Sequence, residues 1–273
     1  MSGHVAALLK VDHFLDRANH LPTGVIVDHR NGTQNEQHHR DRRRILTILA
    51  AAAADGLAGG GLAGVAYAGT LTKAQRDNLN PNEIVSLMKE GNERFRRGGK
   101  LTRDYVAEQS AAAKGQHPAA VILSCIDSRA PAEVIMDLGI GDVFNARVAG
   151  NVSNDDILGS MEFACKVSGA KVVLVMGHTS CGAIKGAIDG VKLGNLTGLL
   201  AKISPAVDTT TFAGDRSSKN PAFVDAVAAR NVELTMKSIR AQSAILRDLE
   251  SAKAIKIAGA IYNLSTGRVD FLA

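Results

Sequence analysis

Two short clusters of reactive side chains stand out in this chain of 273 residues. The first reads Ser124-Cys125-Ile126-Asp127-Ser128-Arg129, and the second, roughly fifty residues later, places His178 and Cys181 in a His-x-x-Cys spacing. Two thiolates, one imidazole and one carboxylate form a borderline-soft tetrahedral set of donors, which suits Zn²⁺ better than Mg²⁺ or Ca²⁺. A site built from both clusters is therefore predicted to bind zinc.

The thiols also allow a different chemistry. In a thiol enzyme, Cys125 or Cys181 would be the nucleophile, activated by a helix N-terminus and by Arg129. The chain has three cysteines, which cannot pair completely and do not form the dense pattern of a disulfide scaffold. The third, Cys165, lies in an apolar helical run and is predicted to be a buried small hydrophobic residue.

Each cluster directly follows a short apolar segment that is typical of a buried strand. These segments are residues 119–124 and 171–176. In parallel α/β sheets, ligands collect at the carboxyl ends of the strands, so we expect both clusters to face one crevice. The His-x-x-Cys spacing predicts that both ligands lie on a turn entering a helix, where the N-terminal dipole favours thiolate over thiol.

The rest of the chain after residue 80 alternates between helical and strand patterns. Helices are predicted over residues 81–97, 155–168, 181–189 and 222–251, with another opening at Pro131, and further strands over 142–148, 255–262 and 268–272. Strands that alternate with helices predict an α/β fold with a mostly parallel central sheet, flanked by helices and carrying an antiparallel edge strand.

The composition argues against nucleic acid as a partner. The chain is 45% hydrophobic and 22% charged, as is ordinary for a soluble globular protein. Its 32 basic and 27 acidic residues leave a thin positive excess, and it has no tryptophan on which single-stranded nucleic acid could stack. Nucleic-acid binding is therefore not expected, and a small-molecule substrate is.

In this order and at this distance, the two clusters resemble those of the β-carbonic anhydrase family. The resemblance covers nearly all of residues 80–273, from Glu90-Gly91-Asn92-Glu93-Arg94-Phe95 to Thr266-Gly267-Arg268. It implies that Cys125, His178 and Cys181 are zinc ligands. It also implies the family's fold and its assembly as a homo-dimer or a larger homo-oligomer, with the helix around residues 90–97 as the exchanged arm.

The resemblance further implies a catalytic pair, Asp127 and Arg129. Asp127 would either occupy the fourth zinc position as a metal ligand or pair with Arg129 and leave that position to water. The implied reaction is the reversible hydration of carbon dioxide to bicarbonate and a proton, by attack of zinc-bound hydroxide on CO₂. Arginine suits the pairing because its planar fork can hold a carboxylate bidentately.

Substrate-binding residues follow from the same resemblance. Gln116 matches a glutamine that hydrogen-bonds substrate, Phe144 an apolar wall of the pocket, and Gly182 a backbone N–H that assists bicarbonate binding. Some members of the family carry an inhibitory bicarbonate site that needs a tryptophan. This chain has Ile122 at that position, so we expect no such switch, although Arg147 matches the arginine of those sites.

Three alternatives remain open from the sequence. A zinc hydrolase of the same fold could act on a CO₂ analogue such as carbonyl sulfide or carbon disulfide. The thiol enzyme described above is the second alternative, and bound metal would count against it. The third is a non-catalytic oligomeric protein stabilised by zinc, in which Asp127 and Arg129 would be idle.

The first 68 residues differ from the rest of the chain. Residues 1–41 are polar and rich in histidine, and are predicted to be disordered. Residues 42–68 begin with paired arginines and continue into an Ala/Gly/Leu-rich segment, which indicates an export signal of the twin-arginine type. Residues 69–273 would then form the catalytic domain, periplasmic or secreted, with no stable membrane insertion; a cytoplasmic location is the alternative.

Overall fold

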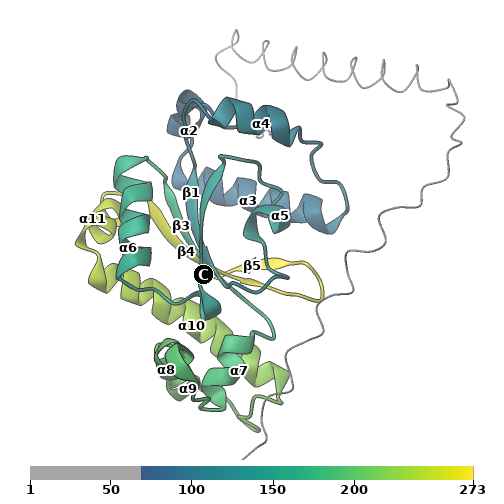
Figure 1. Cartoon of the computed structure of the whole chain (residues 1–273), viewed down its shortest axis with the longest axis vertical. Helices are drawn as coiled ribbons and strands as arrows, with labels where there is room; N and C mark the ends of the chain where they lie inside the picture. The colour runs from purple at the N-terminus through teal and green to yellow at the C-terminus, as the bar shows by residue number, and fades with distance from the viewer. Residues whose placement is uncertain (1–68, 273) are drawn as a thin grey trace, which may run out of the picture. The chain divides into compact units, whose positions relative to one another are not determined.

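A single five-stranded sheet forms the centre of the domain in the computed structural model, which describes residues 69–272 (Figure 1). The strand order is β2-β1-β3-β4-β5. The strands are β1 (Ala120–Ser124), β2 (Val143–Arg147), β3 (Val172–His178), β4 (Lys256–Tyr262) and β5 (Val269–Phe271). The first four are mutually parallel and β5 is antiparallel to β4. This confirms the predicted mostly parallel sheet with an antiparallel edge strand.

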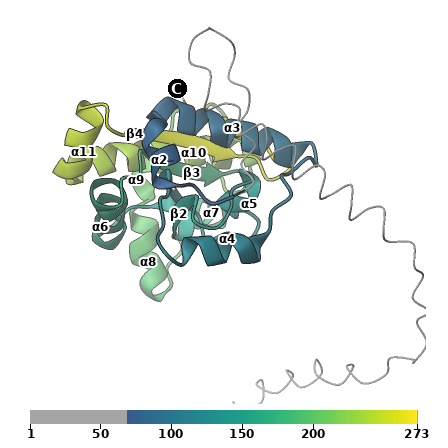
Figure 2. The same cartoon turned by 90° about the horizontal axis from the view of Figure 1, so that it is seen from above.

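Helices cover both faces of the sheet, as the views of Figures 1 and 2 show. One face packs against α3 (Pro81–Arg96) and α5 (Ala132–Ile135) through strand residues such as Ile122 and Leu174. The other packs against α6 (Asp155–Glu162), α10 (Pro221–Gln242) and α11 (Ala244–Ser251) through their neighbours Leu123 and Val173. Successive residues of a strand point to opposite faces of the sheet. Because both faces are buried, consecutive residues of the central strands are all apolar.

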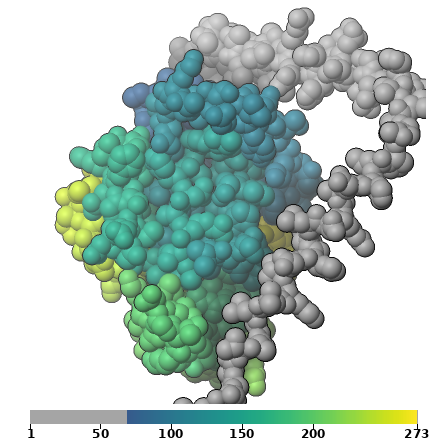
Figure 3. All heavy atoms as spheres, viewed as in Figure 1, coloured from purple at the N-terminus to yellow at the C-terminus, as the bar shows by residue number. Residues whose placement is uncertain are grey.

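A third apolar cluster lies at the carboxyl end of the sheet. It is built by α7 (Gly182–Ile188), α8 (Gly194–Ala201), α9 (Ser204–Thr209) and the first half of α10. In Figure 3, the green atoms of α8 and α9 gather at one end of the domain. Cys125 and Cys181 belong to this cluster, so the reactive thiols lie in a packed apolar surrounding.

The segment before β1 contributes to the same core. It contains α2 (Lys73–Asn78), α3 and α4 (Tyr105–Ala112), and Ile84 and Met88 of α3 are each 2% exposed. Helix α3 starts at a capping box: the Asn80 side chain accepts from Glu83 N, and the Glu83 side chain accepts from Asn80 N. Both side chains satisfy donors that the first helical turn leaves free.

Several predicted boundaries were wrong. The helix predicted over 222–251 breaks at Ser243, whose hydroxyl accepts from Leu246 N at 3.1 Å and donates to Glu162 at 2.6 Å. The helix predicted over 155–168 is present, as the α-helix Asp155–Glu162 followed directly by a π-helical segment, Phe163–Val167. The helix after Pro131 is a single turn. Strand β3 runs on to His178, which pairs with Tyr262 of β4, so this histidine lies on a strand and not on a turn.

The predicted tail, residues 1–41, and the predicted export signal, residues 42–68, lie outside the described residues. Within residues 69–272, no helix combines the length and the apolar character needed to cross a bilayer.

Candidate metal centre

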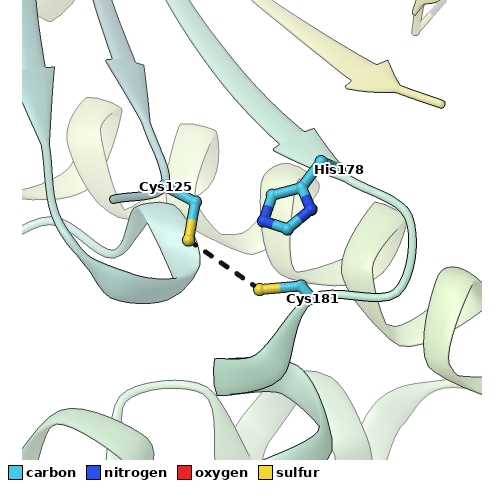
Figure 4. A group of neighbouring side chains, drawn as sticks. All are labelled: Cys125, His178 and Cys181. Atoms are coloured by element: carbon cyan, nitrogen blue, oxygen red, sulfur yellow. Dashed lines mark hydrogen bonds between the residues drawn. The ribbon is translucent and has the colours of Figure 1, made fainter. Parts of the chain in front are cut away.

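Two neighbouring strands bring the reactive side chains together. Cys125 directly follows β1, His178 is the last residue of β3, and Cys181 precedes the first turn of α7. Because β1 and β3 are adjacent and parallel, their carboxyl ends meet at one edge of the sheet. The Sγ atoms of the two cysteines are 4.0 Å apart, and one ligand atom from each of the three residues lies within 4.8 Å of the others (Figure 4).

The three side chains fit a tetrahedral metal ion with soft ligands. All are buried, with 4% or less of each residue exposed. His178 donates from Nδ1 to the carbonyl oxygen of Thr179 at 2.9 Å, and its Nε2 has no hydrogen-bond partner among the described residues. The hydrogen bond of Nδ1 orients the imidazole ring. It leaves Nε2 buried beside the two thiols and free to bind zinc, as is usual for histidine ligands of this metal.

The two thiols are hydrogen-bonded to each other, and this contact shifts their pKa values in opposite directions. The hydrogen bond from Cys181 lowers the pKa of Cys125 to about 4, against the opposing effect of burial, and His178 and the N–H of Gly150 add to this lowering. The same hydrogen bond raises the pKa of Cys181, with burial, while the backbone N–H groups of Ala183 and Ile184 act in the other direction. Because a metal ion binds thiolates, metal binding would release the proton of the Cys181 thiol.

Asp127 and Arg129 form a bidentate ion pair beside the cysteines and the histidine. The guanidinium donates from Nε to Oδ1 at 2.9 Å and from Nη2 to Oδ2 at 2.7 Å, and the Arg129 backbone N–H also reaches Oδ1 at 3.0 Å. These contacts hold the pKa of the Asp127 carboxyl well below its usual range. Oδ2 lies 3.8 Å from His178 Nε2. Of the two positions expected for Asp127, the structure has the one paired with Arg129.

Comparison with known proteins identifies the family. A family model described as carbonic anhydrase matches residues 120–269. Carbonic anhydrase 2 of Mycobacterium tuberculosis is 35% identical over 197 residues, which cover 70% of this chain and 92% of the relative. Carbonic anhydrase of Mycolicibacterium smegmatis is 33% identical over 195 residues, covering 71% and 94%.

Solved structures specify the class. The β-carbonic anhydrase CafA of Aspergillus fumigatus is 28% identical, with a TM-score of 0.55 over 60% of this chain and 79% of that one. The Coccomyxa β-carbonic anhydrase is 26% identical, with a TM-score of 0.54 over 60% and 75%. This chain belongs to the β-class carbonic anhydrases.

In this β-carbonic anhydrase, Arg147 holds the loop of the first cluster. It is the last residue of β2, and it donates from Nε to the carbonyl oxygen of Cys125 at 2.9 Å and from Nη2 to that of Asp127 at 2.6 Å. The resemblance matched Arg147 to the arginine of an inhibitory bicarbonate site. Here its guanidinium ties the thiol and the carboxylate to the end of the neighbouring strand.

Gly150 completes the surroundings of Cys125. Its N–H points at Cys125 Sγ from 3.4 Å, and its carbonyl accepts from the buried Asn231 of α10 at 2.8 Å. Gly150 has φ of +67°, and a Cβ there would lie 2.5 Å from Ile203 Cδ1. Glycine meets both requirements, because it has no Cβ and adopts positive φ without steric cost.

The three residues predicted to bind substrate are placed differently from one another. Gly182 is exposed at the start of α7, next to Cys181. Gln116 precedes β1, and so lies at the amino end of a strand whose five residues extend about 16 Å toward Cys125. Phe144 is the second residue of β2 and packs edge-to-face on Phe163, with the ring centroids 6.2 Å apart. Within one chain, the fold brings Gly182 to the metal ligands and leaves Gln116 and Phe144 away from them.

Two residues of this site, Asp225 and Asn231, were not predicted from the sequence, and neither was the structural role of Arg147. Asp225 accepts the Ser180 N–H from α10, 45 residues along the chain. No motif marks a contact that depends on how a later helix packs. Cys165 is buried as predicted; burial raises its pKa to about 12.

Proposed function

We propose that this chain catalyses the zinc-dependent, reversible hydration of carbon dioxide to bicarbonate and a proton. The observation that carries the proposal is the buried set Cys125, His178 and Cys181, with an unpartnered ring nitrogen, beside a carboxylate that Arg129 holds in place. Zinc held by these three residues would supply a Lewis acid that makes water acidic enough to give hydroxide near neutral pH.

The chain's own residues would orient the reacting water. Asp127 is ionised at neutral pH, and Arg129 lowers its pKa further and fixes the position of both carboxylate oxygens. Its Oδ2 is therefore placed to accept a hydrogen bond from the water and to turn an oxygen lone pair toward the carbon of CO₂. Arg129 hydrogen-bonds both carboxylate oxygens of Asp127, which keeps this carboxylate from rotating toward the metal and becoming a ligand. Gly182 begins α7 directly after Cys181, and its N–H would donate a hydrogen bond to a bicarbonate oxygen.

Stopped-flow CO₂ hydration, with zinc quantified on the same sample of the full chain, tests the proposal. We expect about one zinc per chain, as a mononuclear site of this kind requires, and a rate that rises with pH, because two thiolates donate more charge than imidazoles. Zinc near one per chain without hydration at about pH 8–9, where hydroxide is favoured, would contradict it. Faster turnover of carbonyl sulfide or carbon disulfide would favour the alternative substrate.

Inhibitor binding offers an independent check. The solved Coccomyxa β-carbonic anhydrase is described in complex with acetazolamide. We propose that the same sulfonamide inhibits this enzyme in competition for the metal position, so that zinc-free protein should not bind it. Inactivation by iodoacetamide of a zinc-free but active preparation would instead support the thiol enzyme.

We also propose that the enzyme is a homo-dimer or a larger homo-oligomer. Strand β2 pairs with β1 on one side and with no other described strand, so its second edge is open. Phe163, which packs edge-to-face on Phe144 of β2, is 52% exposed. A solved β-carbonic anhydrase of Sordaria macrospora, 25% identical with a TM-score of 0.53, is described as tetrameric. An exposed apolar surface beside an open edge suits pairing between copies.

Export remains a proposal from residues 42–68. We propose delivery to the periplasm or secretion, supported by the paired arginines that precede an apolar segment. Fractionation of cells carrying Arg42 and Arg43 changed to lysine tests it. Loss of export is expected, and unchanged delivery would mean that the arginines are not the signal.

A further inference from the structure

The turn between β3 and α7 has an unusual backbone. Its two residues, Thr179 and Ser180, separate the proposed ligands His178 and Cys181. Ser180 has φ of +55°, in the left-handed region that residues with a Cβ rarely adopt. Such a conformation persists only where the surroundings hold it, and it changes the direction in which the chain enters α7.

Three contacts hold this turn. The N–H of Thr179 donates to the carbonyl oxygen of Tyr262, the last residue of β4, at 2.9 Å. Thr179 Oγ1 accepts from the N–H of Leu264, two residues later, at 3.0 Å. The third contact comes from α10, where the Asp225 carboxylate accepts the Ser180 N–H at 2.9 Å. Of the three, only the contact from Asp225 is made by an ionised side chain, and charge-assisted hydrogen bonds are the stronger kind.

One peptide group connects Asp225 to His178. The N–H of Ser180, which Asp225 accepts, and the carbonyl of Thr179, which accepts from His178 Nδ1 at 2.9 Å, belong to the same planar amide. A carboxylate bound to the N–H of an amide polarises its carbonyl and makes it a better acceptor. The contact therefore both fixes the plane of this peptide and strengthens the hydrogen bond that orients the imidazole.

We propose that Asp225 is a positioning residue for the metal centre. Through the Thr179–Ser180 peptide, its carboxylate strengthens the hydrogen bond that holds the proton of His178 on Nδ1. The lone pair of Nε2 then points toward the cysteines. Through Ser180, it keeps the left-handed turn that sets Cys181 at the start of α7. This inference rests on the proposed zinc site, because it concerns how two of the three ligands are oriented toward the metal.

Four variants of the zinc-loaded full chain test the assignment: D225A, D225N, S180G and the double variant D225A/S180G. E233A is a matched control, since Glu233 is an exposed acidic residue of the same helix that pairs with Arg230. Two quantities are measured on each: kcat and KM for CO₂ hydration, and the rate at which a chromophoric chelator removes zinc. The absorption spectrum of the cobalt-substituted protein reports the ligand geometry independently of activity.

For D225A we expect kcat to fall by about 10-fold or more and the rate of zinc release to rise by a similar factor, because loss of a residue that orients a metal ligand has effects of this size. KM should change little. D225N retains an oxygen acceptor of the same shape but loses the charge, so its kcat and its zinc-release rate should lie between those of D225A and the parent. Glycine adopts positive φ freely, so S180G should recover part of what D225A loses. E233A should match the parent.

Unchanged kcat, zinc release and cobalt spectrum in D225A would overturn the assignment. So would an S180G change that worsens D225A instead of relieving it. A parent protein that lacks zinc or hydration activity would contradict the proposed function, which separates the two failures.

Discussion

At the scale of single residues, the pair Asp127 and Arg129 is the feature most open to test. Replacing Arg129 by alanine removes the fork that fixes the carboxylate, and the pKa of Asp127 should then rise toward its ordinary value of 3.8. The carboxylate stays ionised at neutral pH, so any loss must come from its orientation. We expect R129A to retain zinc and to lose about 100-fold in kcat, the size of effect that a misplaced catalytic group produces.

The lysine variant is the matched comparison for this pair. R129K keeps the charge and loses the bidentate geometry, so its kcat should lie between those of R129A and the parent. Zinc content and stopped-flow kinetics on all three proteins are the measurements. Full activity in R129A would show that the ion pair is idle.

The sequence could identify the ligand types but not what holds them. Cysteine, histidine and carboxylate at these spacings predicted a zinc site, because that donor set has few other uses. Asp225 and Asn231 could not be predicted, since each acts on a backbone group that lies far away along the chain. A carboxylate or an amide on a helix face looks in sequence like any solvent-facing polar residue.

At the scale of elements, Glu250 connects the end of α11 to α10 and β4. It accepts from Arg240 Nε and Nη2 at 2.7 and 2.8 Å and from the Ile257 N–H at 3.2 Å. Burial opposes ionisation of Glu250, but these contacts outweigh it and its pKa is lowered from 4.5. Its contribution is therefore present above pH 4.5 and is lost as the pH falls through the lower value of the folded state.

E250Q should accordingly destabilise the protein at neutral pH and matter less in acid. The pair is partly exposed, so we expect a cost of about 0.5–1 kcal/mol at pH 7. That corresponds to a thermal midpoint lower by about 1–4 °C in a domain of this size. Calorimetry at pH 7 and below pH 4.5 measures the gap between variant and parent. A gap that widens in acid would contradict the sign.

The break between α10 and α11 shows what local pattern cannot predict. Good helix formers flank Ser243, with no glycine or proline to mark an end. Serine caps a helix here because Glu162 of α6 accepts its hydroxyl proton while its oxygen accepts from Leu246 N. The continuation of β3 to His178 has a similar origin, since Gly177 and His178 are strand residues by virtue of pairing with β4.

At the scale of the whole molecule, association through the β2 edge can be tested by charge insertion. F163D places a carboxylate against Phe144 of that edge strand, and I245D makes the same change at an exposed position of α11. We expect the parent and I245D to elute as oligomers and F163D to shift toward smaller species, because an unpaired charge in an apolar interface is costly. Size-exclusion chromatography with light scattering is the measurement. A parent protein that is monomeric at micromolar concentration would contradict the assembly.

The fold class was predictable at this scale because the buried strands and the helices alternate along the chain. The packing of residues 69–119 was predicted only in part: the helix at Pro81 was expected, and α2 and α4 were not. Both are short, and the mixed polarity of their residues leaves no clear apolar period.

The most direct test of the central claim is X-ray absorption at the zinc edge, on a sample active in CO₂ hydration. We expect two sulfur ligands at about 2.3 Å from the zinc and two nitrogen or oxygen ligands at about 2.0–2.1 Å. H178A should lose one imidazole contribution and C125S or C181S one sulfur. A first shell without sulfur, or with sulfur that persists unchanged when Cys125 or Cys181 is replaced, would contradict it.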